Sequence, residues 1–458
     1  MLKVVNPASE EPIAELEEDT PQTLARKTAS ARRAQPAWAR SPLGQRLAAV
    51  RRFGDLLQSN RESLAATLTS ETGKPIRQSR NELNAMEGRI AFFLEHAAAA
   101  IEDEIVHRGS GPPALEERIS YEPLGTIVNI SAWNYPYFVG SNVYLPALLT
   151  GNAVLYKPSE FATLSGLAVA ALLHQAGVPQ EIFQPVVGSG EVGRTLLDQE
   201  IDGVCFTGSY TTGRKIAEAV APRLMRVQLE LGGKDPAYVS DDVDVAAAAA
   251  ALVEGAFYNA GQSCCAVERI YVHRRISDRF IEAFVGAVRA LVVGDPADER
   301  TDIGPLARRP QLELLERQVS DAVSRGARLL LGGKRCAGRG YYFEPTVLTA
   351  VDHRMAVMRE ESFGPIIGIQ DVQDDAEAVG LMNDTDYGLT AAVYSADRSR
   401  AERILSQINA GSAYWNCCDR VSPRLPWSGR KHSGLGATLS VAGIRAFVQP
   451  KAWHLRCG

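Results

Sequence analysis

The chain has 458 residues, a hydrophobic fraction of 45%, a charged fraction of 22% and a formal net charge of −5 at pH 7. This length predicts two or three domains rather than a single core, and the composition is typical of a soluble globular protein. The mild negative charge, without a long Lys/Arg block, excludes nucleic acid as the main partner. No apolar stretch is long enough to span a bilayer, so we expect no membrane segment.

The seven cysteines stand at positions 205, 264, 265, 336, 417, 418 and 457. None has the spacing of a zinc knuckle, so we expect no metal site. An odd number of cysteines in a long chain favours free thiols in a reducing compartment. The first residues lack an apolar signal region, and the expected location is therefore the cytoplasm.

The first hundred residues are predicted to be mostly helical. Apolar residues at helical spacing predict three helices, over residues 21–40, 43–71 and 81–101. Residues 105–122 differ, because residues 109–113 have the composition of a turn and residues 118–122 alternate like a strand. We expect a β-hairpin there.

From Gly125 onwards, short apolar strands alternate with helices. The predicted strands cover residues 126–130, 153–156, 183–187, 203–206 and 226–231. The predicted helices between them cover residues 136–150, 163–176, 192–198 and 211–220. Alternation of this kind builds a parallel sheet with helices on both faces. Ligands bind at the carboxyl ends of strands in such sheets, so the loops there are the expected site.

The second half continues this α/β pattern. Strands are predicted over residues 269–272 and 391–394, and helices over residues 243–258, 278–292, 310–325, 375–383 and 398–409. No internal repeat or low-complexity linker interrupts the chain. We therefore expect domains that pack against each other.

Two short segments carry the chemistry. Glu230 precedes a glycine pair, and Cys264 ends a small-residue loop that begins at Gly261. A carboxylate that activates water and a thiolate that attacks a carbonyl are the two halves of covalent acyl chemistry. Asn134 is a candidate donor to the resulting oxyanion. A lone cysteine is more often a small buried hydrophobe than a nucleophile. The prediction for Cys264 therefore depends on the presence of Glu230 and Asn134, and the adjacent Cys265 is expected to face the core.

Two glycine-containing turns are candidate nucleotide sites. Residues from Gly188 to Gly193 spell the G-x-G-x-x-G fingerprint after a strand. No acid at the end of the next strand is placed to hold a ribose, so a tight turn near a ligand is the alternative. Phe206, Gly208 and Ser209 form a stronger phosphate site, because they follow a buried strand and open a helix. Ser209 could also be only an N-cap.

A third strand end carries Lys157, Ser159 and Glu160. The lysine and the glutamate suit the two hydroxyl groups of an adenosine ribose. Glu160 would repel the 2′-phosphate of NADP, so NAD is favoured and NADP is the second choice. The alternative is a surface ion pair, which contributes little energy.

Several segments together resemble the NAD(P)-dependent aldehyde dehydrogenase superfamily, of the hydrolytic, non-acylating type, over nearly the whole chain. They are residues 6–8, 71–75, 133–136, 157–160, 206–209, 230–234, 261–264, 361–365 and 431–434. The resemblance implies an α/β fold with a Rossmann-like NAD domain, an α/β catalytic domain and a small β oligomerisation element. It assigns these parts to residues 1–104 with 123–230, to 231–430, and to 105–122 with 440–458. It also implies a homodimer or homotetramer.

The resemblance further implies roles for single residues. Cys264 matches the nucleophile, Glu230 the general base and Asn134 the oxyanion amide of the family. The implied cofactor contacts are Lys157, Ser159, Glu160, Gly188, Gly193, Phe206, Gly208, Ser209, Leu231, Gly232, Glu361 and Phe363. The implied reaction oxidises an aldehyde to the carboxylic acid with NAD, through a thiohemiacetal and a thioester.

Some alternatives stay open at this stage. Acylating members of the family pass the acyl group of the thioester to coenzyme A and typically lack the glutamate, so Glu230 favours hydrolysis. A third hypothesis is a catalytically idle binding protein on the same fold. Thr438 stands where many members carry an acid that helps to relay protons. Arg420 and Arg424 either anchor a carboxylate of the substrate or face solvent, and solvent is favoured. The motifs do not specify the aldehyde.

Overall fold

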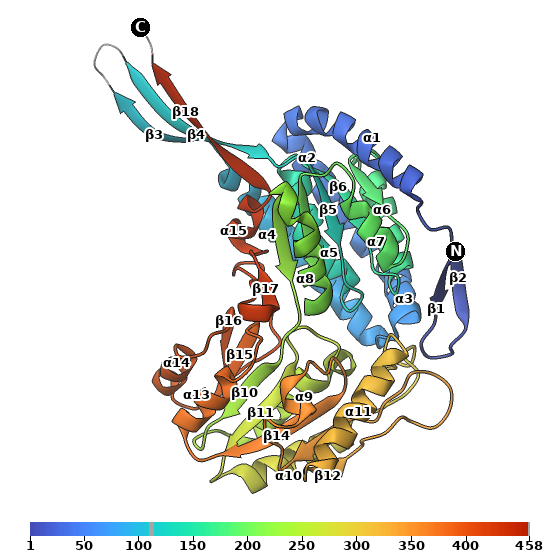
Figure 1. Ribbon diagram of the computed structural model, residues 1–458, viewed down its shortest axis with the longest axis vertical. Helices are drawn as coiled ribbons and strands as arrows, with labels where there is room; N and C mark the ends of the chain where they lie inside the picture. Colours follow the sequence, from blue (N-terminus) through green and yellow to red (C-terminus); the bar gives the residue numbers. More distant parts are fainter. Residues whose placement is uncertain (110–113, 457–458) are drawn as a thin grey trace.

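The computed structural model describes residues 1–109 and 114–456. Most of the turn predicted over residues 109–113, and Cys457, lie outside this part of the chain. Figure 1 shows two α/β bodies, one above the other, and a narrow arm of strands that projects from the upper body.

The N-terminal region is helical, as predicted, apart from its first residues. Strands β1 (Leu2–Val5) and β2 (Pro12–Leu16) form an antiparallel hairpin that the sequence analysis missed. The helix predicted over residues 43–71 is wrong as a single helix, because the backbone leaves helical geometry at Asn60, where φ is −105° and ψ is 10°. The helices are α1 (Pro21–Arg40), α2 (Leu43–Ser59), α3 (Arg61–Thr72) and α4 (Ile76–Ile101).

The upper body is built on a six-stranded sheet in the order β17-β9-β8-β5-β6-β7. Its neighbours run parallel except for β17, which pairs antiparallel with β9. The strands are β5 (Thr126–Ile130), β6 (Ala153–Lys157), β7 (Phe183–Pro185), β8 (Gly203–Thr207), β9 (Arg226–Glu230) and β17 (Gly434–Leu435). The helices between them are α5 (Pro136–Leu149), α6 (Thr163–Gln175), α7 (Gly190–Leu197) and α8 (Tyr210–Val220). The predicted strand-helix alternation is confirmed.

The lower body is built on a seven-stranded sheet in the order β12-β13-β14-β11-β10-β15-β16, with only β12 antiparallel to its neighbour. The strands are β10 (Asp235–Val239), β11 (Val267–His273), β12 (Arg328–Leu331), β13 (Thr346–Thr349), β14 (Ile366–Val372), β15 (Thr390–Tyr394) and β16 (Ser412–Trp415). The helices are α9 (Val245–Phe257), α10 (Ser277–Arg289), α11 (Pro310–Ser324), α12 (Ala356–Arg359), α13 (Asp375–Asn383) and α14 (Arg398–Leu405). The helix predicted over residues 398–409 therefore ends earlier than expected.

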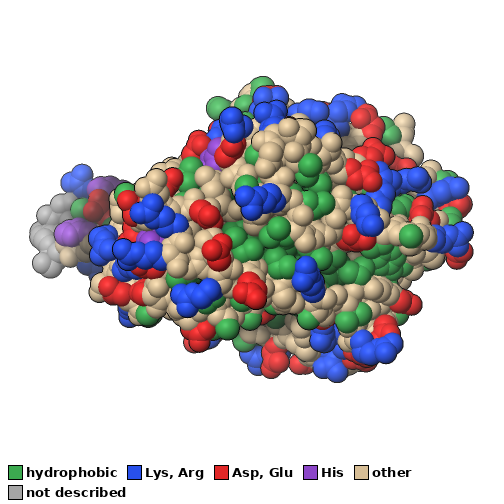
Figure 2. Space-filling view, turned by 90° about the horizontal axis from the view of Figure 1, so that it is seen from below, with side chains coloured by type: hydrophobic (Ala, Val, Ile, Leu, Met, Phe, Trp, Pro, Cys, Tyr) green, Lys and Arg blue, Asp and Glu red, His purple; other side chains and the backbone are tan. Residues whose placement is uncertain are grey.

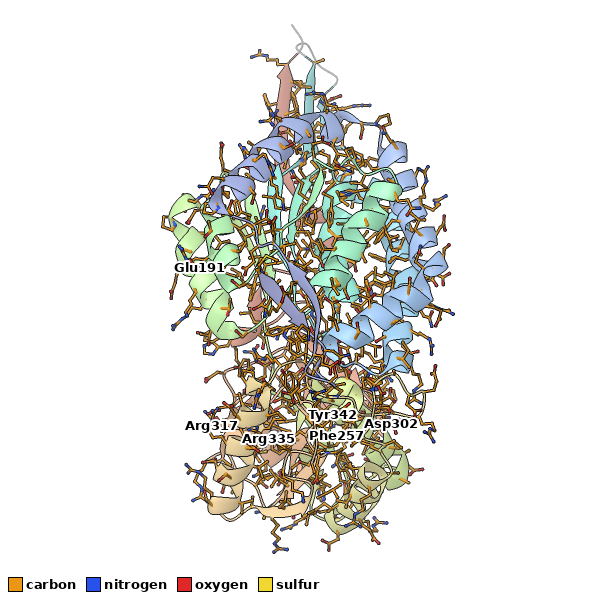
Figure 3. The ribbon with its side chains drawn as sticks, turned by 90° about the vertical axis from the view of Figure 1, so that its right-hand side faces the viewer. Glu191, Phe257, Asp302, Arg317, Arg335 and Tyr342 are labelled. Atoms are coloured by element: carbon orange, nitrogen blue, oxygen red, sulfur yellow. The ribbon has the colours of Figure 1, made fainter. Side chains whose placement is uncertain are left out.

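Each body has its own hydrophobic core. Figure 3 shows Glu191 in the upper body and Phe257, Arg317 and Arg335 in the lower one. On the face shown in Figure 2, acidic and basic side chains are interspersed among apolar ones, in agreement with the mild net charge. No helix in the described ranges is long and apolar enough to cross a membrane.

The projecting arm is a three-stranded antiparallel sheet of β3 (Glu104–Gly109), β4 (Leu115–Pro123) and β18 (Val448–Arg456) (Figure 1). The hairpin predicted from the first two strands is confirmed, and β18 pairs with β4 along its full length. On the arm, Ile105 and Val106 are 47% and 57% exposed. Helix α15 (Ser440–Arg445) precedes β18 and packs against α4, with Ile444 in the upper core.

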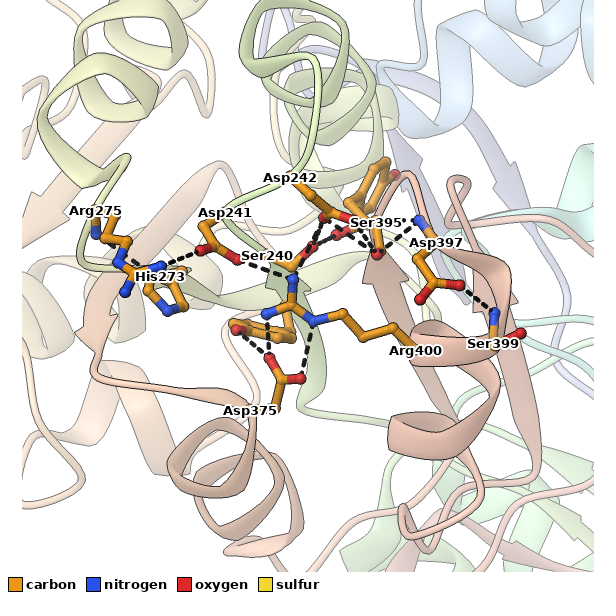
Figure 4. A network of polar contacts seen from close by, with 12 residues as sticks. Ser240, Asp241, Asp242, His273, Arg275, Asp375, Ser395, Asp397, Ser399 and Arg400 are labelled. Carbon is orange, nitrogen blue, oxygen red and sulfur yellow. Dashed lines mark hydrogen bonds and ion pairs between the residues drawn. The ribbon is translucent and has the colours of Figure 1, made fainter.

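An ion-pair network ties the helices of the lower sheet together (Figure 4). Arg400 of α14 donates through Nε and Nη2 to Asp375 of α13, at 2.8 and 2.6 Å. Its Nη1 donates to Asp241, which follows β10, at 2.8 Å. Because the guanidinium is only 18% exposed and uses its fork geometry, it fixes three segments relative to each other.

Candidate active site

Cys264 lies on a strained loop between the short helix η2 (Tyr258–Gly261) and β11. Asn259 and Ala260 both adopt left-handed backbone conformations, with φ of 53° and 54°, which non-glycine residues rarely do. The Cys264 side chain is half-buried, whereas Cys265 is 3% exposed, with its Sγ 2.9 Å from the Asp419 carboxylate. The expected difference between the two thiols is therefore present.

Asn134 is joined directly to the thiol loop. Its Nδ2 donates to the carbonyl oxygen of Gln262 at 3.2 Å, and Asn259 Nδ2 donates to the Asn134 carbonyl oxygen at 3.3 Å. The Asn134 side chain is 4% exposed. Two of the three predicted catalytic residues thus come from segments that are hydrogen-bonded to each other.

A buried ion pair holds the helix that begins just after Asn134. Glu82 Oε1 accepts hydrogen bonds from the backbone N–H groups of Tyr137 and Phe138, at 2.9 and 3.2 Å. These groups lie in the first turn of α5, where a carboxylate is favoured by the helix dipole. Lys74 Nζ pairs with Glu82 Oε2 at 2.5 Å and lies 3.8 Å from the Tyr135 ring centroid. The chain directly after Asn134 is therefore fixed by Glu82 of α4 and by Lys74, which precedes that helix.

Glu230 ends strand β9 and is 9% exposed. Thr438 Oγ1 donates a hydrogen bond to its Oε1. Burial raises the pKa of Glu230 to about 7, against the opposing effects of the Thr438 hydrogen bond and the charge of Arg89. A carboxylate with a pKa near neutrality suits general-base work.

The glycine pair after Glu230 is where the separate segments meet. A Cβ atom on Gly233 would lie 2.9 Å from the carbonyl oxygen of Cys264, and one on Gly232 would overlap the Glu361 carboxylate. The Gly233 N–H donates to Glu361 Oε1 at 3.2 Å. Side chains at these positions would push apart the loops that carry Cys264 and Glu361, which explains the need for glycine.

The loop of Glu361 and Phe363 is anchored by a second buried ion pair. Lys234 Nζ pairs with Glu268 Oε2 at 2.7 Å. Glu268 also accepts from the backbone N–H of Phe363 at 2.9 Å, and Phe363 adopts a left-handed φ of 47°. Burial and the neighbouring Glu268 raise the pKa of Glu361 to about 8. The Phe363 ring packs edge-on against Trp133, with the centroids 5.5 Å apart.

Lys157 is a buried amine at the end of β6. It is 2% exposed, and its Nζ donates to the Pro158 carbonyl oxygen at 3.2 Å. Burial lowers its pKa, while the charge of Glu160 acts in the opposite direction. An ammonium group has three donors, so Lys157 retains donors suited to the hydroxyl groups of a ribose. Gly193 lies against the aliphatic part of the Lys157 side chain, since a Cβ on Gly193 would be 3.4 Å from Lys157 Cδ.

The two predicted glycine turns also lie at strand ends of the upper sheet. Ser209 is the N-cap of α8 and accepts from the Thr212 N–H at 3.4 Å, which confirms its role as an N-cap. The Gly208 N–H donates to the Glu230 carbonyl oxygen at 3.0 Å, which brings this turn beside the proposed base. Gly188 has a left-handed φ of 152°, and a Cβ there would lie 2.7 Å from Val192 Cβ.

The remaining predicted cofactor contacts lie around these turns. Ser159 is 9% exposed and its Oγ accepts from the Phe161 N–H at 3.3 Å. Phe206 is buried, at 7% exposure, beneath Gly208. The Leu231 N–H donates to the Ser433 carbonyl oxygen at 3.0 Å. The upper sheet contributes a helix N-terminus, a buried ammonium and the half-buried Glu160, and the lower body contributes the half-buried Glu361. Together they form a donor and acceptor set that fits a dinucleotide.

Other candidates lie away from this arrangement or were missed. Arg420 is 61% exposed and pairs with Glu254 at 3.3 Å, and Arg424 is also exposed, in agreement with the favoured interpretation. Arg89 was not singled out, although it is 3% exposed. Its sequence signal is an arginine among the inward-facing positions of α4, which include Met86 and Phe93.

Comparison with known proteins finds relatives that match over nearly the whole chain. The aldehyde dehydrogenase family matches residues 1–453. A betaine aldehyde dehydrogenase of Cereibacter sphaeroides is 36% identical, over 100% of this chain and 94% of that protein. The crystal structure of lactaldehyde dehydrogenase from Escherichia coli is 33% identical, with a TM-score of 0.95 over 99% of this chain and 95% of that one. Betaine aldehyde dehydrogenase from Staphylococcus aureus in complex with NAD+ is 32% identical, with a TM-score of 0.95 over 99% and 91%.

These similarities extend over nearly the whole length of both partners, so they concern the complete fold and not one motif. They confirm the predicted α/β fold and the predicted class of oxidoreductase. They do not favour the coenzyme-A-acylating alternative. The chain belongs to the aldehyde dehydrogenase family.

Proposed function

We propose that this protein oxidises an aldehyde to the carboxylic acid with NAD, through a thiohemiacetal and then a thioester on Cys264. The observation that carries the proposal is the meeting of three segments. The Cys264 loop is bonded to Asn134 through Gln262 and lies against Gly233, three residues after Glu230.

The roles of the side chains follow from their chemistry. The Cys264 thiolate attacks the carbonyl carbon, and Asn134 Nδ2 stabilises the oxyanion. When bound, NAD supplies the acceptor for the hydride that leaves the substrate carbon. Glu230 then takes a proton from water, which attacks the thioester, releases the acid and restores the thiol.

The cofactor contacts that we propose divide by the part of NAD that they hold. Lys157 and Glu160 bind the adenosine ribose, with Ser159, Gly188 and Gly193 shaping this end of the site. Ser209 and the N-terminus of α8 bind the pyrophosphate, beside Phe206 and Gly208. Glu361 and Phe363 hold the nicotinamide riboside, next to Leu231 and Gly232.

The same proposal extends to organisation and location. Residues 1–104 and 123–230 form the NAD domain, residues 231–430 the catalytic domain, and residues 105–122 and 440–458 the oligomerisation element. Exposed apolar side chains on the arm support pairing with another subunit in a homodimer or homotetramer. The free thiols of the described cysteines support a cytoplasmic location.

Replacement Glu230→Gln tests the chemistry. It keeps the shape of the side chain and removes the base, so the enzyme should produce about one NADH per active site and then stall. Intact-mass measurement should find the acyl group on the protein. Wild-type steady-state turnover in this variant would show that the assigned base is wrong, and a rate that depends on coenzyme A would favour the acylating alternative.

A further inference from the structure

Arg89 of α4 is a buried cation with one unused edge. Its Nη1 donates to the Phe138 carbonyl oxygen at 3.2 Å and to Asn142 Oδ1. In the part of the chain that the structure describes, the buried Nε has no hydrogen-bond partner, and no carboxylate lies within ion-pair distance of the guanidinium. An unpaired buried charge is costly, so this arrangement needs a reason.

The position of Arg89 relates it to the acyl site. Its Cζ lies 4.0 Å from the centroid of the half-buried Phe138 ring, in the helix that begins just after Asn134. Arg89 is also close enough to Glu230 for each charge to act on the pKa of the other. The guanidinium therefore packs on the helix that follows the proposed oxyanion donor, and its charge acts on the proposed base.

The acids in this region are already occupied by other donors. Glu82 is neutralised by Lys74, and Glu230 accepts from Thr438. Asp419 accepts from Ser263 Oγ at 3.1 Å and from the Cys265 thiol at 2.9 Å. Burial lowers the pKa of Arg89 only to about 10, so the guanidinium keeps its charge at pH 7.

We propose that Arg89 binds a carboxylate of the substrate, so that the physiological aldehyde is an ω-oxo carboxylate. The unused edge of a guanidinium carries two parallel N–H groups, which match the two oxygens of a carboxylate. This inference rests on the proposed function, because it concerns the substrate of that same site. A cationic aldehyde such as betaine aldehyde would be disfavoured by the same charge.

The test compares three aldehydes with NAD: 4-oxobutanoate, the uncharged butanal and betaine aldehyde. We expect kcat/KM to be about 100-fold higher for 4-oxobutanoate than for butanal, mostly through KM, since a buried charged hydrogen bond discriminates strongly. Arg89→Met should reduce this ratio by at least ~30-fold, and Arg89→Lys should retain part of it because the charge remains. Equal kcat/KM for 4-oxobutanoate and butanal in the wild type, or a preference for betaine aldehyde, would overturn the proposal.

Arg46 provides a matched control. It is also a buried arginine, 5% exposed, whose Nη1 donates to two carbonyl oxygens, of Trp38 and Ala39, away from the site residues. Arg46→Met should keep the wild-type ratio. An equal loss with 4-oxobutanoate and butanal in Arg89→Met would show that Arg89 only supports α5, and would also overturn the proposal.

The failure of the proposed function has a different signature, which is absence of NADH with every aldehyde. The carboxylate site is then judged without turnover, by measuring how succinate slows the alkylation of Cys264 by iodoacetamide. Protection in the wild type that is lost in Arg89→Met supports the site, and equal alkylation rates with and without succinate overturn it.

Discussion

Thr438 donates a hydrogen bond to Glu230, although the two residues are 208 positions apart in the chain. The contact forms where β17 pairs with β9, so the late segment delivers its hydroxyl group to the end of a strand in the upper sheet. The bond stabilises the charged carboxylate and opposes the effect of burial on its pKa. Thr438 thus positions the proposed base and tunes it.

Replacement Thr438→Val should shift the pH dependence of deacylation. Deacylation needs the carboxylate form of Glu230, so its rate should rise with pH through about 7 in the wild type. Loss of the hydrogen bond removes an effect that lowers the pKa, and the rise should move upwards by up to ~1 pH unit, as expected for a bond of ~1.4 kcal/mol. The measurement is kcat against pH with thioester hydrolysis limiting. Thr438→Ser keeps the donor and should follow the wild type; an unchanged profile in the valine variant contradicts the tuning role.

The two adjacent cysteines should differ sharply. Cys264→Ser removes the thiolate nucleophile and should reduce kcat by at least ~1,000-fold. Cys265→Ser changes a buried thiol that bonds to Asp419 and should keep most of the activity, because a hydroxyl group makes the same bond. Steady-state NADH formation and melting temperature, measured on both variants, separate chemistry from folding. Loss of activity in folded Cys265→Ser with activity retained in Cys264→Ser would reverse the assignment.

Glu160 should determine the preference for NAD. Replacement Glu160→Gln removes a negative charge from the proposed ribose site but keeps a group that bonds to hydroxyls. The ratio of kcat/KM for NADP to that for NAD should rise by ~10-fold, the effect of ~1.4 kcal/mol of repulsion relieved. Glu402, exposed on α14 of the lower body and paired with Arg398, offers a control charge outside the site, and Glu402→Gln should not change the ratio. A rise in both variants would mean that only overall charge matters.

The network around Arg400 should contribute mainly to stability. Arg400→Leu leaves Asp375 and Asp241 without their shared partner (Figure 4). We expect the free energy of unfolding to fall by roughly 3 kcal/mol, since removal of one member of a partly buried pair leaves charges uncompensated. Urea denaturation, with unchanged KM for NAD as the check on the site, measures this. Arg398→Leu, which breaks an exposed pair on the same helix, should cost less than about 1 kcal/mol.

Much of the upper sheet could be predicted because its signals are local. Strands such as β5 and β6 are continuous apolar runs, and each is followed by a helix that begins at a recognisable residue such as Pro136. The catalytic candidates were recognisable for a related reason. A thiol, a carboxylate and glycines lie within short segments. The sequence also predicted a close approach of other groups at Gly233, and the structure shows that the backbone of Cys264 is the group that approaches.

Other features depend on contacts between distant segments. Strand β17 contains two residues and has no periodicity of its own, so its place beside β9 follows only from the fold. Arg89 looks like one charged residue in an amphipathic helix, and its meaning depends on Phe138 and Glu230. The break at Asn60 was hidden because apolar spacing continues on both sides of it.

The antiparallel pairing of Gly434–Leu435 with β9 has a consequence for biosynthesis. A ribosome makes the proposed nucleophile and the first parallel strands long before it makes Thr438. During translation the emerging upper sheet therefore has an open edge at β9. The Glu230 carboxylate at the end of that strand still lacks the hydroxyl group of Thr438, which later bonds to it. The sheet closes, and the base acquires its final environment, only when the last part of the polypeptide returns to a body begun several hundred residues earlier.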